Sequence, residues 1–236
     1  MLRVMTYNVH RWEDDHDALA TVLRACSPDL VMLQEAPSGL GAWRRRTELA
    51  LSGGLRLLAG ARRTAALAAD PGRWQPRTRW VVRPVVRRYH RVVIPQLPNG
   101  AVAATTDLDG VLVTVIGCHL GLHNQGRLDE LRQVLHLTPQ DHPYVVVGDI
   151  NEPAGGPVWE LAAADGLIDQ GAAEPRPTFP ADRPQNRIDA IWTSPAGDRS
   201  GGLDVRLIDP ASLGIESDLL ARASDHLPVI AEIRRG

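Results

Sequence analysis

The chain has 236 residues, of which 44% are hydrophobic and 23% are charged, and its formal net charge is −2. A chain of this size buries a large apolar core without disulfides, and two cysteines form no disulfide framework. No apolar run approaches the roughly 20 residues of a membrane-spanning helix, which argues against a transmembrane protein. We therefore expect one soluble, cytoplasmic domain over residues 1–236, without a signal peptide and monomeric.

Strands and helices alternate in the first part of the chain. Leu19, Val22 and Leu23 recur at helical spacing, which predicts a helix from Asp15 to Cys26. The predicted elements of this part are a strand at 2–9, the helix at 15–26, a strand ending at 35, a helix at 42–51 and several short strands within 55–93.

Antiparallel pairs follow in the second part. The pair Asp109-Gly110 is a strong turn signal and predicts a hairpin over residues 101–120. Leucines at helical spacing predict a helix from Arg127 to Leu137. The remaining predicted elements are a strand at 144–151, a helix at 157–164 and strands at 187–194, 203–209 and 227–235. This mixture predicts an α/β protein with mixed sheets.

One strand, YVVVGDIN at 144–151, changes from apolar to polar at its end. Its apolar run indicates a strand that is covered on both faces. Side chains alternate along a strand, so we expect Asp149 and Asn151 to lie on the same side. Ligands of such sheets gather beyond the strand ends, so other strands should deliver polar groups to the same place.

The other predicted strands also carry polar residues at their ends. Each one alone is explained by a turn, a solvated acid or a partly buried histidine. Together they form an oxygen-rich set with two imidazoles, which suits Mg²⁺, Mn²⁺ or Ca²⁺ better than zinc. Such a set matches metal-assisted hydrolysis of phosphoesters. These further residues are Asn8, Glu35, His119, Asp189, Asp225 and His226.

Six short blocks carry a family resemblance: TYNVH, LQE, CHL, GDIN, RIDAIW and SDHLPV, in this order. They resemble the signature blocks of the endonuclease/exonuclease/phosphatase superfamily, to which the deoxyribonuclease I-like nucleases belong. The resemblance extends from Thr6 to Ile230, and the phrase TFPADRPQNRIDAIW is similar to one in small bacterial members. It implies a four-layer α/β/β/α sandwich in which two mixed sheets pack face to face.

The resemblance also implies a divalent ion, Mg²⁺ or Mn²⁺, and the residues that hold it. Glu35 resembles the principal metal ligand of the family. Asn8 resembles the residue that supports the metal or the phosphate beside it, and Asp225 resembles a further ligand.

The remaining matched residues correspond to the catalytic positions of the family. Asp149 resembles the residue that positions or deprotonates the attacking water, and Asn151 resembles the amide that hydrogen-bonds the water or the phosphate. His226 and His119 resemble the two histidines that contact the phosphate. Asp189 resembles the carboxylate that fixes the tautomer of the His226 ring. The implied reaction is in-line attack by water without a covalent intermediate.

Three features depart from the family pattern or leave it open. His10 stands where repair-type members carry an acidic residue, and the stretch Thr64–Asp70 lacks the polar pattern common in the middle of the family. Arg127 lies where many members carry an arginine at the start of a helix. A surface salt bridge with Asp129 or Glu130 explains it equally well.

The substrate stays open. Thirteen of the 26 arginines lie in segment 41–91, together with Trp43, Trp74, Trp80 and Tyr89. Such a segment suits binding of nucleic acid through phosphate contacts and base stacking, although a solvated basic face explains it as well. A phospholipid headgroup or a small soluble phosphoester is the alternative substrate, and a non-hydrolytic binding protein is the alternative function.

Overall fold

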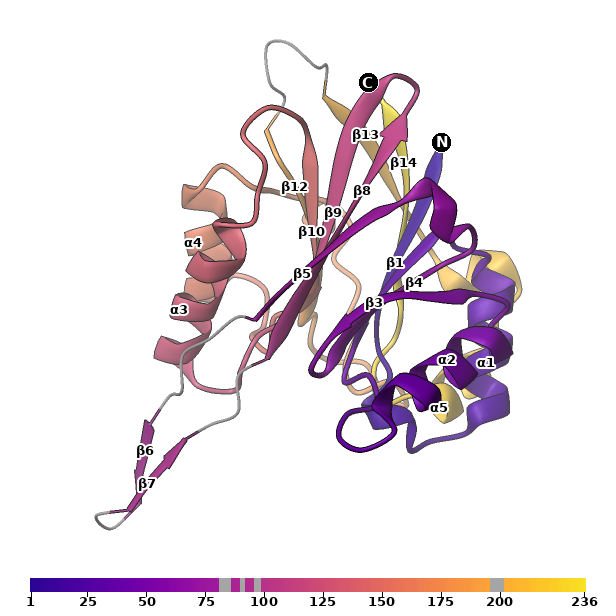
Figure 1. Cartoon of the computed structure of the whole chain (residues 1–236), viewed down its shortest axis with the longest axis horizontal. Helices are drawn as coiled ribbons and strands as arrows, with labels where there is room; N and C mark the ends of the chain where they lie inside the picture. The colour runs from indigo at the N-terminus through magenta and orange to yellow at the C-terminus, as the bar shows by residue number, and fades with distance from the viewer. Residues whose placement is uncertain (81–85, 90–91, 96–98, 196–201) are drawn as a thin grey trace.

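Two six-stranded mixed sheets pack face to face, with helices on both outer surfaces (Figure 1). The computed structural model describes residues 1–80, 86–89, 92–95, 99–195 and 202–236. The predicted α/β/β/α sandwich is confirmed.

The first sheet has the strand order β13-β14-β1-β2-β4-β3. Its two central strands, β1 and β2, are parallel, and all its other neighbours are antiparallel. The polar residues that follow β1 and β2 therefore lie at the same edge of the sheet. The bounds are β1 Leu2–Asn8, β2 Leu30–Gln34, β3 Arg56–Ala61, β4 Thr64–Ala68, β13 Leu203–Ile208 and β14 Val229–Arg235.

The second sheet has the strand order β11-β12-β10-β9-β8-β5. Here β9 and β10 form the parallel pair, so each sheet has one pair of parallel strands at its centre. The bounds are β5 Gln75–Trp80, β8 Gly100–Leu108, β9 Val111–His119, β10 Tyr144–Asp149, β11 Ile168–Asp169 and β12 Asp189–Thr193. Two further strands, β6 Val86–Tyr89 and β7 Val92–Pro95, pair with each other (Figure 1).

The helices form the two outer layers. On the first sheet lie α1 (His16–Cys26), α2 (Ala42–Ser52) and α5 (Ser217–Ala223), and on the second lie α3 (Asn124–Leu135) and α4 (Pro157–Ala164) (Figure 1). Short 3₁₀ turns occur at His10–Trp12, Pro71–Arg73 and Pro210–Leu213. None of the described helices combines the length and the apolarity needed to cross a bilayer.

The apolar strands supply three layers of core. The middle layer lies between the sheets and includes Val4, Met32, Val115 and Val147. Because β1, β2, β9 and β10 bury side chains on both faces, their sequences are nearly continuous apolar runs. The polar residues at their ends are the exceptions, and these residues define the candidate site.

Two helices differ from the sequence-based expectations. Helix α3 begins at Asn124, whereas the sequence predicts a start at Arg127. The first turn of the helix contains only polar residues and glycine, so it shows no apolar periodicity from which the earlier start could be predicted. Helix α5 has seven residues and was not predicted, since such a short helix gives a weak periodic signal. Both helices pack against their sheets through few apolar residues.

Candidate active site

Asp149 is the centre of a buried polar network. It is the last residue of β10 and is only 1% exposed. Strand β10 lies between β9 and β12, and the strand register pairs Asp149 with His119 on one side and with Asp189 on the other. Three polar residues from distant parts of the chain therefore meet at one level because their strands are neighbours.

The end of β10 combines a close backbone contact at Gly148 with a turn at Asn151. Gly148 has φ +155°, and a Cβ at this position would collide with the carbonyl oxygen of Cys118. After it, Asn151 adopts φ 55° and its backbone N–H donates to Asp149 Oδ1 at 2.9 Å. The expectation that strand alternation places Asp149 and Asn151 on the same side is therefore wrong. A turn, and not an extended chain, brings them together.

Asn8 connects the two sheets at the site. It is the last residue of β1, and its Nδ2 atom donates to Asp149 Oδ2 at 3.0 Å and lies 3.4 Å from His226 Nε2. Its Oδ1 atom accepts from the backbone N–H of His10 at 3.0 Å. The hydroxyl of Ser224 donates to the backbone carbonyl of Asn8 at 2.7 Å, which ties the end of β1 to the segment that precedes β14.

His226 and Asp189 form a buried pair. His226 Nδ1 lies 2.9 Å from Asp189 Oδ2, and its Nε2 atom lies 3.8 Å from Asp149 Oδ2. Burial alone would lower the pKa of His226, but the charge and hydrogen bond of Asp189, with further charges nearby, raise it to about 9. The ring of Phe179 packs against the imidazole at a centroid distance of 4.8 Å. Without a bound cation, this imidazole is therefore protonated at neutral pH.

His119 and Asn151 form the other side of the network. The Nδ2 atom of Asn151 donates to the carbonyl of Leu120 at 2.8 Å and lies 3.1 Å from His119 Nε2. His119 Nε2 is also 3.5 Å from Asp149 Oδ2. In contrast to His226, the Nδ1 atom of His119 is buried and has no hydrogen-bond partner among the described residues. Among the described residues, a carboxylate therefore holds the Nδ1 atom of His226 but not that of His119.

Glu35 follows β2 at the same edge, where Gln34 pairs with Asn8 in the strand register. It adopts φ 50°, which turns the chain out of the strand. Its Oε2 atom is buried, has no hydrogen-bond partner in the described part of the chain, and lies 3.3 Å from Arg11 Nε. This carboxylate oxygen faces a cation of the protein but is otherwise uncompensated.

Asp225 and Glu35 both act on His10. Burial lowers the pKa of His10, but its hydrogen bond to Asp14 and the charges of Asp225 and Glu35 outweigh this effect and raise it. Asp225 is half-buried, and the hydroxyl of Ser224 lies 3.4 Å from its Oδ1 atom. The two carboxylates that the family resemblance assigns to the metal thus share one electrostatic neighbourhood.

The structure thus connects six of the eight sequence-predicted site residues and places the other two at the same edge. Asn8, His119, Asp149, Asn151, Asp189 and His226 form one chain of short contacts. Within the described residues, the side chains whose ligand atoms lie close enough together to hold one ion are Asp149, Asp189 and His226. In this group, however, Asp189 Oδ2 and His226 Nδ1 already form a hydrogen bond with each other.

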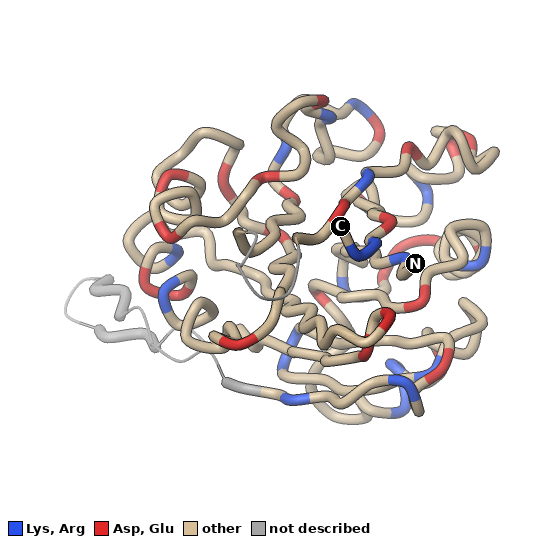
Figure 2. The backbone as a smooth tube through the Cα atoms, turned by 90° about the horizontal axis from the view of Figure 1, so that it is seen from above, with Lys and Arg blue, Asp and Glu red and all other residues tan. Residues whose placement is uncertain are grey.

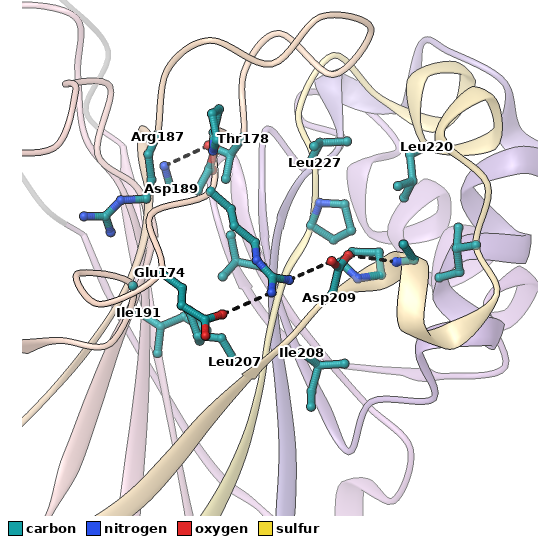
Figure 3. Close-up of a pocket in the computed structure, with 18 of the residues that line it drawn as sticks. Glu174, Thr178, Arg187, Asp189, Ile191, Leu207, Ile208, Asp209, Leu220 and Leu227 are labelled. Atoms are coloured by element: carbon teal, nitrogen blue, oxygen red, sulfur yellow. Dashed lines mark hydrogen bonds and ion pairs between the residues drawn. The ribbon is translucent and has the colours of Figure 1, made fainter.

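A separate pocket of about 250 Å³ lies behind Asp189, between β12, β13, β14 and α5 (Figure 3). Its walls are mostly apolar side chains such as Ile191. Arg176 lies at the pocket, with Nη1 3.0 Å from Asp209 Oδ2 and Nη2 3.2 Å from Glu174 Oε2. Of the six connected site residues, Asp189 is the one that lines this pocket, so the pocket is adjacent to the candidate site and separate from it.

Arg127 and Glu152 were not predicted as partners. Arg127 is buried, and its Nη2 atom lies 3.0 Å from Glu152 Oε1. The alternative of a surface salt bridge with Asp129 or Glu130 is therefore wrong. Asp129 pairs instead with the exposed Arg132. No local motif signals an ion pair between side chains that are 25 positions apart in the sequence.

The arginine-rich segment 41–91 does not form one continuous face in its described part. Arg46 is buried and donates to the carbonyl of Pro37, whereas the exposed Arg44 pairs with Glu48. Trp74 is buried between the sheets and is not accessible for base stacking, whereas Trp43 is 64% exposed. Basic and acidic positions are interspersed around the fold (Figure 2). The side chains of Tyr89 and Trp80 lie outside the described part of the structure.

A family model decides the classification. The model of the Endonuclease/Exonuclease/phosphatase family matches residues 5–226. The chain belongs to this family. The family resemblance predicted from the six sequence blocks is confirmed, and the matched range includes each of the eight sequence-predicted site residues.

Relatives of this endonuclease/exonuclease/phosphatase chain are distant in sequence. The uncharacterized protein YbhP of Escherichia coli K12 is 29% identical over 132 residues, and the same match is found in YbhP of Shigella flexneri. The match covers 53% of this chain, which spans about half (48%) of the length of these relatives.

Solved structures share the fold over the whole chain. A conserved protein of Enterococcus faecalis superposes with a TM-score of 0.72 at 18% identity, covering 100% of both chains. A humanized TDP2 of D. rerio gives 0.70 at 19% identity and covers 99% of this chain and 98% of its own. The mannosyl-6-phosphatase of Bacteroides thetaiotaomicron gives 0.69 at 14% identity, with 99% of each chain covered. At these identities the similarity establishes the fold.

Proposed function

We propose that this chain is a divalent-metal-dependent phosphodiesterase that cleaves a P–O bond by in-line attack of water. One observation carries the proposal. The buried carboxylate of Asp149 has its Oδ2 atom 3.0 Å from Asn8 Nδ2, 3.5 Å from His119 Nε2 and 3.8 Å from His226 Nε2. A base enclosed by three nitrogen-bearing side chains suits a reaction in which a water loses a proton beside an anionic phosphate.

Asp149 is suited to take the proton of that water. Burial raises the pKa of its carboxyl, the charge of Asp189 adds to this effect, and the neighbouring His119, His226 and Asn8 oppose it. A carboxylate with a raised pKa accepts a proton more readily than a solvated one. The hydrogen bond from the backbone of Asn151 to Oδ1 holds the group and leaves Oδ2 directed to the site.

His226 is suited to bind the phosphate. Asp189 holds the proton on Nδ1, so the protonated ring presents Nε2–H toward Asp149 and the space beside it. A cationic donor fixed in this way stabilises the negative charge that develops on the phosphate oxygens. His119, whose Nδ1 atom lacks a partner, contacts the same phosphate in this proposal, and Asn151 orients it.

The residues present fit a hard divalent cation. Glu35 offers a buried oxygen that has no hydrogen-bond partner among the described residues and pairs with Arg11, and Asp225 and the Oδ1 atom of Asn8 supply further oxygens at the same edge. In the proposal these three residues hold Mg²⁺ or Mn²⁺. The ion supplies charge neutralisation at the phosphate and at the leaving oxygen.

Nucleic acid is the first candidate substrate. Trp43 and Arg44 are exposed on the first turn of α2, and the neighbouring Arg45 donates to the carbonyl of Arg11, which itself pairs with Glu35. This series of contacts connects basic and aromatic side chains to the site. Cleavage of nucleic acid should then decrease steeply as the salt concentration rises.

A phospholipid headgroup is the second candidate, and exposed apolar side chains favour it. Leu40 is fully exposed in the segment between β2 and α2, and Leu122 is 74% exposed just after β9. Both positions are close in sequence to residues of the site, Glu35 and His119. Apolar side chains in such positions suit contact with a bilayer surface.

Hydrolysis of bis-p-nitrophenyl phosphate tests the proposal, with Mg²⁺, with Mn²⁺ and with EDTA. We expect turnover with either ion and none with EDTA. A lack of turnover with every divalent ion would favour the non-hydrolytic binding protein. A panel of single- and double-stranded DNA, RNA, sphingomyelin, glycerophosphodiesters and phosphomonoesters at two ionic strengths then identifies the substrate.

A further inference from the structure

Two segments at the active-site edge carry site residues but belong to different connections. The first begins at His119, the last residue of β9, continues to His123 and leads into α3. The second follows β10, contains Ile150 to Gly156 and leads into α4. The hydrogen bond from Asn151 to the carbonyl of Leu120 is one direct link between them.

Arg127 on α3 makes a second, stronger link. Its Nη1 atom donates to the carbonyl of Leu122 at 2.8 Å, and its Nη2 atom donates to Asn124 Oδ1 at 2.6 Å and to Glu152 Oε1 at 3.0 Å. One guanidinium thus binds the segment that carries His119 and the residue that directly follows Asn151.

Glu152 extends this link to α4. Its Oε2 atom accepts from the backbone N–H of Val158 at 2.7 Å, and its backbone carbonyl accepts from Trp159 Nε1 at 3.0 Å. A Cβ at Gly156 would lie 2.6 Å from Glu152 Oε2, so the chain passes this carboxylate at a position that only glycine accommodates without rearrangement. Both carboxylate oxygens and the backbone carbonyl of Glu152 are engaged.

The burial of the Arg127–Glu152 ion pair indicates that the pair fixes the arrangement of the two segments rather than adding much stability. The side chains of Arg127 and Glu152 are only 8% and 6% exposed. Removing two charges from water costs about as much as their attraction returns, so a buried ion pair adds little net stability. It does, however, permit few alternative arrangements of the two segments.

From these contacts we infer that Arg127 and Glu152 are positioning residues, which set the spacing between His119 and Asn151 and thereby the geometry around Asp149. The inference rests on the proposed hydrolytic function. Neither residue touches the reacting atoms. Both act through the two segments, whose site members meet where Asn151 Nδ2 lies 3.1 Å from His119 Nε2.

The test compares Glu152→Gln and Arg127→Met with the control Arg132→Met. Arg132 is on the same helix and forms an exposed pair with Asp129. Measurements are kcat and KM for bis-p-nitrophenyl phosphate, the Kd of Mn²⁺, the Tm, and the imidazole NMR signals of His119. We expect kcat to fall about 10- to 100-fold in both test variants. The KM and the Mn²⁺ affinity should stay within about threefold, the signals of His119 should shift, and the control should match the wild type.

The outcomes separate positioning from stability. A lower Tm with unchanged kcat and unchanged His119 signals would overturn the inference and leave only a structural role. If Arg127→Met does not fold, Glu152→Gln decides, because it keeps an acceptor oxygen for Val158 and replaces the charged oxygen that faces Arg127 with an amide NH2 group, which cannot accept from the guanidinium. If the wild type hydrolyses nothing, the proposed function fails. The His119 signals of the variants then still decide whether the pair positions this ring.

Discussion

His226 Nδ1 lies 2.9 Å from Asp189 Oδ2, and this contact turns the opposite ring nitrogen toward the buried carboxylate of Asp149. Asp189 comes from β12 and His226 from the segment before β14, which belong to different sheets. The packing of the two sheets thus determines the protonation and the orientation of the imidazole. This relationship gives the first prediction.

Asp189→Asn should lower the pKa of His226 from about 9 toward its ordinary value of 6.5. The amide keeps the shape of the side chain but removes the charge that favours the imidazolium. An NMR titration of the imidazole signals in the metal-free protein measures the shift. Asp141→Asn is the matched control, because Asp141 contacts His142 Nδ1 at 2.8 Å at the surface. If the pKa of His226 does not change in Asp189→Asn, Asp189 does not set its charge.

The same pKa predicts how stability depends on pH without a metal ion. Because the folded-state pKa of His226 is raised, its stabilising contribution is complete below pH 6.5 and is lost as the pH rises through 9. The free energy of unfolding should fall on the order of 3 kcal/mol over this window. Urea unfolding in EDTA at several pH values measures it, with His226→Gln as control. If the free energy of unfolding depends on pH in the same way in the wild type and in His226→Gln, His226 is not the cause of the pH dependence.

Arg11→Ala should strengthen the binding of divalent cations. Arg11 Nε lies 3.3 Å from Glu35 Oε2 and competes with an ion for the same carboxylate. Because Arg11 is half exposed, we expect a modest gain of about two- to fivefold in affinity by calorimetry. Glu35→Gln should instead weaken binding more than about tenfold. Arg44→Ala, which removes an exposed pair with Glu48, is the control. Unchanged affinity in both test variants would remove Glu35 from the metal site.

Gly148→Ala should destabilise the fold more than Gly110→Ala does. Both glycines have positive φ, but a Cβ at Gly110 has open space around it, whereas one at Gly148 collides with the carbonyl oxygen of Cys118. We expect a loss of about 1 kcal/mol at Gly110 and about 3 kcal/mol at Gly148 in urea unfolding. Equal losses at the two positions would show that the close contact of β9 and β10 does not constrain residue 148.

The sequence predicts those parts of the site that depend on strand ends. Asn8, Glu35, His119 and Asp149 each end or follow a central apolar strand, and parallel neighbours bring such ends to one edge. The alternation of elements predicts an α/β protein with mixed sheets, and the family resemblance of the six blocks implies the α/β/β/α sandwich. These features are local in sequence or common to the family, and for that reason the sequence predicts them.

Other contacts were not predictable, because they depend on side chains that meet only in the folded chain. The pair Arg127–Glu152 and the contact between Arg11 and Glu35 have no sequence signature. The sequence predicts a strand that continues to Asn151, because an asparagine alone does not distinguish left-handed from extended backbone. The clustered arginines of segment 41–91 predict one basic feature, whereas its described residues are divided between the core, ion pairs and solvent.

The most direct test of the account is the turnover of Asp149→Asn, measured with bis-p-nitrophenyl phosphate and Mn²⁺ alongside the Tm. The amide keeps the volume of the side chain but cannot accept the proton of the attacking water. We expect kcat to fall by at least about a thousandfold while the protein stays folded. A folded Asp149→Asn variant whose kcat remains within about tenfold of the wild type would contradict the role of Asp149 as the base and the proposed reaction with it.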